Sequence, residues 1–231
     1  MSEIPHPTNG ETRISTGIPG LDTITNGGLA RNHLYLVQGT PGAGKTTLTF
    51  QFLLAGTALG ERGLYVTLSE SADEVHSLAA SHGWPLDGID LVDLGSESTA
   101  FDADAQNTLF FPSEVELGEM MRRVLREIDR VRPARVVFDS LSELRLLAQT
   151  PLRFRRQILA LKQYLSARNA TALVVEDTSI ENEDLQLESL AHGVIALTQA
   201  SPIYGADRRR LRVAKLRGST FLGGHHDFRI E

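Results

Sequence analysis

The chain has 231 residues, 41% of them hydrophobic and 23% charged, which is ordinary for a globular domain. Its net charge of −6 at pH 7 argues against nucleic acid as a partner. It contains no cysteine, which excludes disulfides and thiolate metal sites and is compatible with a reducing cytoplasm. No apolar run approaches the roughly 20 residues of a membrane-spanning helix, so we expect no membrane partner. We expect a flexible segment over residues 1–12 and one domain over 13–231, because no repeat or composition break divides the chain.

A glycine-rich stretch at residues 39–47, GTPGAGKTT, matches the phosphate-loop pattern G-x-x-x-x-G-K-[ST] without a mismatch. It lies between a predicted buried strand over 34–37 and a predicted helix over 47–59, the context that such a loop requires. Glycines let successive backbone N–H groups point at an anion, and the helix adds the positive end of its dipole. The pattern predicts a nucleotide site in which Lys45 reaches the β- and γ-phosphates and the Thr46 hydroxyl binds Mg²⁺. The loop residues expected to contact the nucleotide are Thr40, Pro41, Gly42, Ala43, Gly44, Lys45, Thr46 and Thr47.

Strands and helices alternate along most of the chain. Further strands are predicted at 64–68, 89–94, 135–140, 172–176, 194–198, 211–216 and 228–230. Helices are predicted from a Ser71–Glu74 capping box to Gly83, from a Ser113–Glu116 capping box to Pro133, over 152–169, and briefly within 180–190. Residues 95–111 show no period and predict a mobile loop. The alternation predicts an α/β fold with helices on both faces of a mostly parallel sheet, extended by late antiparallel strands.

Two acids follow predicted strands at the rim of the sheet that carries the phosphate loop, since right-handed crossovers bring these strand ends together. Asp139 ends an apolar strand and is expected to bind Mg²⁺ together with Thr46; a turn acid that merely ends the strand is the alternative. Glu70 follows the strand at 64–68 and is expected to orient or deprotonate the water that attacks the γ-phosphate. The alternative for Glu70 is a local role at the start of the next helix, through the helix dipole.

A basic run near the C-terminus, RRRLRVAKLRG at 208–218, offers cations for a triphosphate. On a strand, Lys215 and Arg217 point to the same face, roughly 7 Å apart, which suits them to hold charge that spreads during phosphoryl transfer. Composition alone favours a solvated charged strand. A nucleic-acid patch is the next alternative, but no aromatic residue interleaves the run.

Several motifs together resemble a KaiC-type domain of the RecA-fold ATPases, over residues 14–230. They are TGIPGLD at 16–22 with GGL at 27–29, the phosphate loop, VTLSE at 66–70, SHGW at 81–84, VVFDS at 136–140 and KLRG at 215–218. The resemblance implies a RecA-like fold and a ring of such domains, a homohexamer that binds ATP between neighbouring chains. It also implies that Lys215 and Arg217 act catalytically in trans, on the neighbour's γ-phosphate. Ser219 and Ser81 match family positions near the nucleotide.

Two departures from the family pattern bear on function. The family carries paired glutamates after the second strand, whereas Ser69 precedes Glu70 here, so hydrolysis of ATP to ADP and phosphate is predicted to be slow or absent. Clock proteins of this family join two such domains and carry phosphorylated Ser or Thr residues in the second. One domain is expected here, and we therefore do not expect a self-phosphorylating clock.

The leading prediction is a cytoplasmic, Mg²⁺-dependent ATPase whose homo-oligomeric ring acts as a nucleotide-controlled regulatory or signalling assembly. The prediction leaves room for a regulatory protein partner that the sequence does not identify. The main alternative is an ATP-gated interaction module with little turnover, which Ser69 favours. A recombinase-like protein that binds single-stranded DNA is a weaker alternative because of the net acidity, and an autokinase is a minor one.

Overall fold

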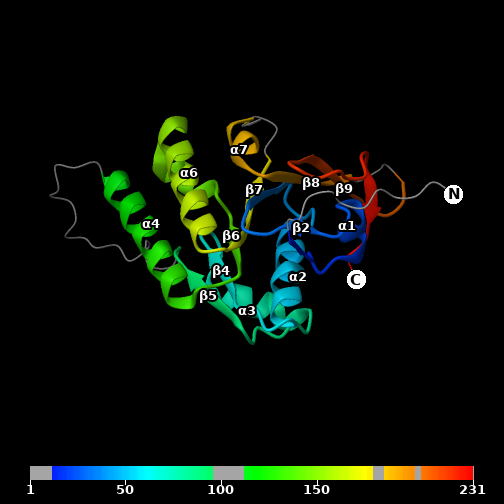
Figure 1. The fold of residues 1–231 in the computed structure, drawn as a ribbon, viewed down its shortest axis with the longest axis horizontal. Coiled ribbons are helices and arrows are strands. Elements are labelled where there is room, and N and C mark those ends of the chain that lie inside the picture. Colours follow the sequence, from blue (N-terminus) through cyan, green and yellow to red (C-terminus); the bar gives the residue numbers. More distant parts are fainter. Residues whose placement is uncertain (1–11, 96–111, 179–184, 201–203, 231) are drawn as a thin grey trace.

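The computed structural model describes residues 12–95, 112–178, 185–200 and 204–230, and only the backbone of 112–116 and 185–186. Most of the predicted flexible segment and of the predicted loop at 95–111 lies outside these ranges. The described residues form an eight-stranded sheet in the order β10-β9-β8-β3-β7-β6-β4-β5 and a separate ribbon, β1-β2 (Figure 1). None of the helices described is long and apolar enough to cross a membrane.

The sheet confirms the predicted α/β class. Its parallel strands are β3 (Leu34–Gly39), β4 (Gly63–Thr67), β5 (Ile89–Asp93), β6 (Arg135–Asp139), β7 (Thr171–Asp177) and β8 (Gly193–Ala200). Two antiparallel strands extend the sheet beyond β8, namely β9 (Arg208–Leu216) and β10 (His226–Phe228). The parallel strands end at one rim, where β3 leads into the phosphate loop. The C-terminal residue of every parallel strand therefore lies at the same rim as that loop.

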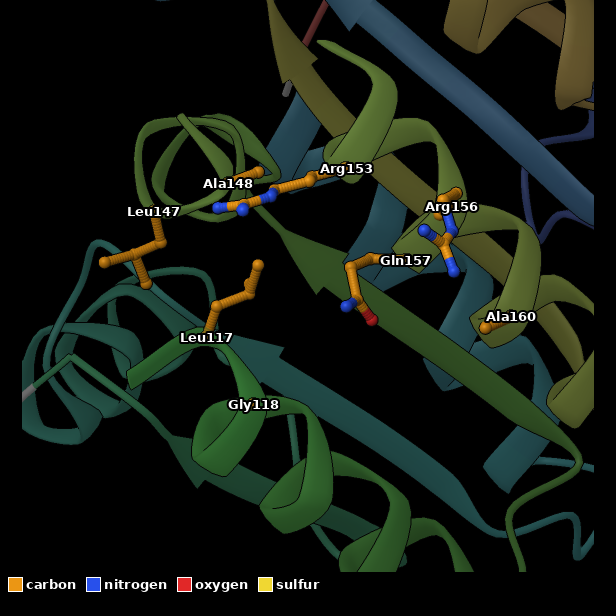
Figure 2. A pocket seen from close by; sticks show the side chains of 8 residues that line it. All are labelled: Leu117, Gly118, Leu147, Ala148, Arg153, Arg156, Gln157 and Ala160. Atoms are coloured by element: carbon orange, nitrogen blue, oxygen red, sulfur yellow. The ribbon is translucent and has the colours of Figure 1, made fainter. Parts of the chain in front are cut away.

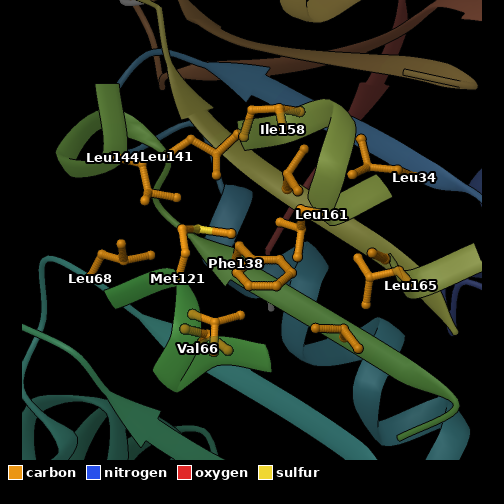
Figure 3. Close-up of a cluster of buried hydrophobic side chains, with 14 of the residues drawn as sticks. Leu34, Val66, Leu68, Met121, Phe138, Leu141, Leu144, Ile158, Leu161 and Leu165 are labelled. Carbon is orange, nitrogen blue, oxygen red and sulfur yellow. The ribbon is translucent and has the colours of Figure 1, made fainter. Parts of the chain in front are cut away.

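Helices cover both faces of the sheet (Figure 1). The helices are α1 (Pro19–Ile24), α2 (Lys45–Thr57), α3 (Ala72–Ser81), α4 (Pro112–Val131), α5 (Ser142–Ala148), α6 (Pro151–Ala167) and α7 (Leu185–Leu190). Successive strand residues point to opposite faces, so Leu34 and Leu36 pack with α4, α5 and α6, while Tyr35 and Val37 pack with α1, α2 and α3. Figure 3 shows the first of these clusters, where Phe138 of β6 lies against Met121 of α4 and Leu161 of α6. Each such fully buried side chain contributes roughly 1.5–3 kcal/mol.

The structure corrects several predicted boundaries. Ser71 and Glu74 do form the capping box of α3, but α4 begins at Pro112, so Ser113 is its second residue and not its N-cap. Proline fits the first turn of a helix, where its missing N–H is not needed. The last strand, predicted at 228–230, is β10 at His226–Phe228.

Four of the elements in the described ranges were not predicted at all. They are α1, α5, and the strands β1 (Arg13–Ile14) and β2 (Leu29–Ala30). Helices of six or seven residues and strands of two residues are too short to show a hydrophobic period. Contacts with the rest of the chain, and not local pattern, stabilise them.

Candidate functional site

The phosphate loop turns between β3 and α2 by using glycine at left-handed positions. Gly42 and Gly44 have φ of +78° and +98°, a region that glycine enters without steric strain. Gly44 immediately precedes α2, so the loop leads into the N-terminus of a thirteen-residue helix. The free N–H groups of the first turn and the helix dipole favour an anion at this point.

Three residues from late in the chain pack against the loop, namely Gln199 of β8, Arg209 of β9 and Ile230, which follows β10. A Cβ at Gly44 would lie 2.8 Å from Ile230 Cδ1, and a Cβ at Gly42 would lie 3.1 Å from Gln199 Oε1. Arg209 Nε donates a hydrogen bond of 3.2 Å to the Gly42 carbonyl oxygen. A Cβ at Gly44 would require the Ile230 side chain to shift, and a Cβ at Gly42 would press on the end of the Gln199 side chain. The sequence did not reveal them, because all three residues lie more than 150 positions further along the chain.

Lys45, the first residue of α2, extends back across the loop, and its side chain is only 8% exposed. The ammonium donates to the carbonyl oxygens of Gly39 at 2.9 Å and Thr40 at 3.0 Å. Its third contact is an ion pair with Asp177 Oδ1 at 2.7 Å. The loop therefore surrounds a nearly buried positive charge, as a phosphate site requires.

Asp139 lies at the end of β6, where its Oδ2 accepts hydrogen bonds from Thr46 Oγ1 at 3.0 Å and from the Tyr65 hydroxyl at 2.8 Å. Burial raises the pKa of Asp139, and the hydrogen bonds from Tyr65 and Thr46 only partly oppose this. Burial and the Asp139 carboxylate likewise raise the pKa of Tyr65. The structure thus brings together the two residues that the sequence predicts as metal ligands. The peptide bond between Asp139 and Ser140 is cis.

The donor set at this point suits Mg²⁺. Magnesium prefers oxygen ligands and is commonly held by one or two protein groups plus phosphate oxygens and water. Thr46 and Asp139 supply one hydroxyl and one carboxylate beside the anion cradle. Among the described residues, no group of three or more His, Cys, Asp or Glu side chains forms a cage of its own. A metal ion here would therefore depend on the phosphates that it accompanies.

Glu70 lies just beyond β4 on the same rim. The Thr67 hydroxyl fixes its backbone by accepting from Glu70 N at 3.0 Å and donating to Glu70 O at 2.7 Å. Burial raises the pKa of Glu70, and the charges of Asp139 and then Glu74 raise it further. Ser69, the preceding residue, is exposed.

Lys215 and Arg217 lie away from the phosphate loop of the same chain, Lys215 level with the middle of β3 and Arg217 level with its beginning. Lys215 pairs with Val194, which pairs with Leu36, and Leu36 is three residues before Gly39. That separation is roughly 10 Å along the strand axis. Arg217 is further away, since its backbone N–H donates to His192 O at the beginning of β8. The structure therefore does not bring this cation pair to the loop of its own chain.

Both side chains instead bind the C-terminal end of α7. Lys215 Nζ donates to Glu188 O at 2.5 Å and to Ala191 O at 2.9 Å, and Arg217 donates to Ser189 O at 2.7 Å. Lys162 of α6 donates to Leu190 O at 2.7 Å. Cations are favoured at this end of a helix, where carbonyl groups have no partner within the helix. Within the described residues, no carboxylate pairs with any of these three cations.

The two serines expected near the nucleotide are also distant from the loop. Ser219 Oγ accepts a hydrogen bond of 2.7 Å from Arg13, so it lies beside the N-terminal ribbon. Ser81 is the last residue of α3, and its hydroxyl donates to Leu78 O at 2.7 Å. Because α3 starts at the rim and its ten residues extend roughly 15 Å, Ser81 lies at the far end of that helix.

Two hollows in the surface differ in their relation to the loop. A pocket of about 420 Å³ lies between α4, α5 and α6, on the face that Figure 2 shows. It is lined by Leu117, Gly118, Leu147, Ala148, Arg153, Arg156, Gln157 and Ala160 and includes none of the predicted site residues. A larger hollow of about 930 Å³ runs along β9 and β10 and includes Arg209 and Ile230, which touch the phosphate loop. Only the second hollow adjoins the loop.

Known proteins resemble this chain over most of its length. The family profile described as "ATPase: KaiC" matches residues 14–231. A UPF0273 protein of Thermotoga maritima is 32% identical over 228 residues, which are 94% of this chain and 92% of that protein. The circadian clock oscillator protein KaiC of Thermostichus vulcanus is 30% identical over 225 residues, 94% of this chain and 42% of that protein. The crystal structure of a KaiC-like protein from Pyrococcus horikoshii OT3 matches with a TM-score of 0.78 and 25% identity over 96% of each chain. This chain therefore belongs to the KaiC ATPase family, whose ATP-binding phosphate-loop fold it shares.

Proposed function

We propose that this protein is a Mg²⁺-dependent ATPase that assembles into a homohexameric ring and encloses ATP between neighbouring chains. The observation that carries the proposal is the position of Lys215 and Arg217, which bind carbonyl groups at the end of α7 and not the loop that holds Lys45. A single chain cannot apply these cations to its own nucleotide. In a head-to-tail ring, each chain contacts the next through the same pair of surfaces. Such a contact brings Lys215 and Arg217 of one chain to the loop of the next.

In such an interface the loop N–H groups and Lys45 hold the β- and γ-phosphates. Mg²⁺ held by Thr46 and Asp139 would neutralise charge on the phosphate oxygens. Glu70 accepts a hydrogen bond from the attacking water and aligns it with the γ-phosphate. The neighbour's two cations leave α7 and stabilise the charge that develops on transfer, an effect worth about 10³–10⁵ in rate for an arginine finger.

The nucleoside part of ATP is proposed to lie in the hollow along β9 and β10. This hollow adjoins the loop through Arg209 and Ile230, and it also contains the aromatic side chain of Phe228. A purine ring is large and flat and is commonly bound against apolar and aromatic side chains.

Mixing two inactive variants tests the arrangement in trans. Lys45→Ala disables the loop but keeps the cations, and the double variant Lys215→Ala/Arg217→Ala keeps the loop. After subunit exchange in an equal mixture, about a quarter of the interfaces combine an intact loop with intact cations. Phosphate release should then recover to about a quarter of the wild-type rate, although each variant alone is inactive.

A second mixture is the control. Lys45→Ala and Asp139→Asn both damage the loop side of the interface, so no interface in their mixture has an intact loop, and no activity should return. Failure of the first mixture to recover, with both variants folded and assembled, contradicts the proposal. Activity per chain that stays constant on dilution to monomers contradicts it as well.

An ATP-gated interaction module with little turnover is a second candidate. It is favoured by the exposed Ser69, which stands where the family pattern has the first of two glutamates. Phosphate release by the wild type and by Glu70→Gln distinguishes the two candidates, since equal, near-zero rates favour the module. In both cases the nucleotide is proposed to set the assembly state, which mass measurements in solution with and without ATP and Mg²⁺ would test.

A further inference from the structure

Asp177 occupies a position that neither motif nor composition singles out. It is the last residue of β7, the strand between β3 and β6, so it lies between the phosphate loop and Asp139. Asp177 is level with Gly39, and Thr178 N donates to the Gly39 carbonyl oxygen at 3.2 Å. The end of β7 is thereby held against the start of the loop.

The Asp177 carboxylate completes the coordination of Lys45. An ammonium group has three N–H donors, and those of Lys45 contact Gly39 O, Thr40 O and Asp177 Oδ1. Two of these acceptors are backbone atoms whose places the loop determines. Asp177 is the only one that can leave by rotating a side chain, and 45% of that side chain is exposed.

The same carboxylate would repel any phosphate group that binds in the loop. Lys45 is 8% exposed, so its charge needs a close counter-charge when no phosphate is present. A phosphate that reaches Lys45 takes over this counter-charge, and Asp177 then lies beside a second anion. The charge of Asp177 already contributes to the raised pKa of Asp139, so an anion at this rim is repelled by its neighbours.

We propose that Asp177 is an internal substitute for phosphate, which pairs with Lys45 in the empty loop and must be displaced before a phosphate group can bind. This inference rests on the proposed nucleotide site. Asp177 sets an affinity threshold under this proposal, because it lowers the affinity of every anion that uses Lys45. Anions with few other contacts, such as pyrophosphate or ADP without metal, are then held weakly, and Mg²⁺-ATP with its neighbour's cations is held best.

Titration calorimetry of the full chain with pyrophosphate and with ADP, both in EDTA, tests the proposal. EDTA removes metal ions, so loss of a metal contact cannot obscure the result. Asp177→Asn keeps the shape of the side chain and removes its charge. The variant should bind both probes on the order of tenfold tighter than the wild type, equivalent to about 1.4 kcal/mol. Misfolding does not produce a gain in affinity, so a structural defect cannot imitate this outcome.

Two comparisons make the result specific to the Lys45 contact. Glu176→Gln removes the same charge one residue earlier, where the side chain pairs with Arg145 on the other face of the sheet, and it should leave both affinities within about twofold of the wild type. In a Lys45→Met background, adding Asp177→Asn should not tighten binding. Equal or weaker pyrophosphate binding by Asp177→Asn overturns the inference. An absence of ATP hydrolysis and assembly, with pyrophosphate binding tightened, would instead count against the proposed function alone.

Discussion

Thr46 Oγ1 donates a hydrogen bond of 3.0 Å to Asp139 Oδ2, although the two residues are 93 positions apart in the chain. Thr46 is held by the first turn of α2, and Asp139 by the end of β6. The fold itself holds these two expected metal ligands side by side. Such preorganisation lowers the reorganisation needed at the moment of reaction.

Asp139→Asn should therefore weaken Mg²⁺ binding and raise the Mg²⁺ concentration that gives half-maximal activity. An amide oxygen is a neutral and weaker ligand than a carboxylate, so phosphate release at saturating ATP should fall on the order of 100-fold or more. Tyr65→Phe is the control, because it removes one hydrogen bond to Asp139 and leaves the carboxylate. It should need about the same Mg²⁺ concentration as the wild type, and an equal loss of activity in both variants would contradict the assignment of Asp139 as the ligand. Phosphate release at a series of Mg²⁺ concentrations measures both.

Glu70→Gln should stabilise the folded protein at neutral pH while it lowers phosphate release. Burial, Asp139 and Glu74 raise the pKa of Glu70 above its ordinary value of 4.5. Below pH 4.5 the folded and unfolded states both carry the proton, and ionisation has no effect on stability. As pH rises through the folded pKa, the ionised side chain destabilises the folded state, which a glutamine avoids.

Urea denaturation across pH measures this difference. The variant should be the more stable protein at about pH 7.5, and the two midpoints should converge near about pH 4. If the stability difference between Glu70→Gln and the wild type does not change with pH, the gain in stability does not come from removing the Glu70 carboxylate.

Glu61→Gln should destabilise the fold strongly. Its carboxylate pairs at 2.7 Å with Arg135, whose side chain is fully buried, and at 2.6 Å with Arg31. Loss of the charge leaves a buried guanidinium uncompensated, which costs about 3–5 kcal/mol. Glu127→Gln is the matched control, since it removes the same charge from an exposed pair with Arg130. It should change the free energy of unfolding by about 1 kcal/mol or less, and similar losses in both variants would be evidence against the special role of burial.

The same pair predicts sensitivity to acid. Burial alone would raise the pKa of Glu61, but hydrogen bonds from Arg135 and Arg31 outweigh it and lower that pKa below 4.5. A lowered folded pKa contributes stability that is present above pH 4.5 and lost as pH falls through the folded value. The difference in unfolding free energy between the wild type and Glu61→Gln should therefore shrink below pH 4.5.

Gly44→Ala should fold but bind nucleotide poorly. Its φ of +98° strains any residue with a Cβ, and that Cβ would lie 2.8 Å from Ile230 Cδ1. The double variant Gly44→Ala/Ile230→Ala relieves the contact but not the strain, so it should recover only part of the lost affinity. Full recovery would show that crowding by Ile230 is the whole cause. Titration with ATP, together with a melting curve for each variant, separates affinity from stability.

The amino-acid sequence by itself determined the phosphate loop and the elements beside it. The motif consists of an apolar strand, glycines at 42 and 44, and the lysine that follows. These residues are adjacent in the chain, so the motif can be recognised without knowledge of distant contacts. The α3 capping box is local in the same way, since Ser71 and Glu74 bind each other's backbone. The order of strands and helices also follows from local periodicity, and with it the α/β class.

The tertiary structure decided which side chains from elsewhere reach that loop. Asp177, Arg209 and Ile230 meet the loop because β7, β9 and β10 pair with their neighbours in a particular register. The same register carries Lys215 and Arg217 away from it. Strand order and register depend on the packing of the whole sheet, because each strand buries its side chains against helices that are remote in sequence. A local pattern shows that a cation or an acid is present, and only the assembled sheet shows at which edge it lies.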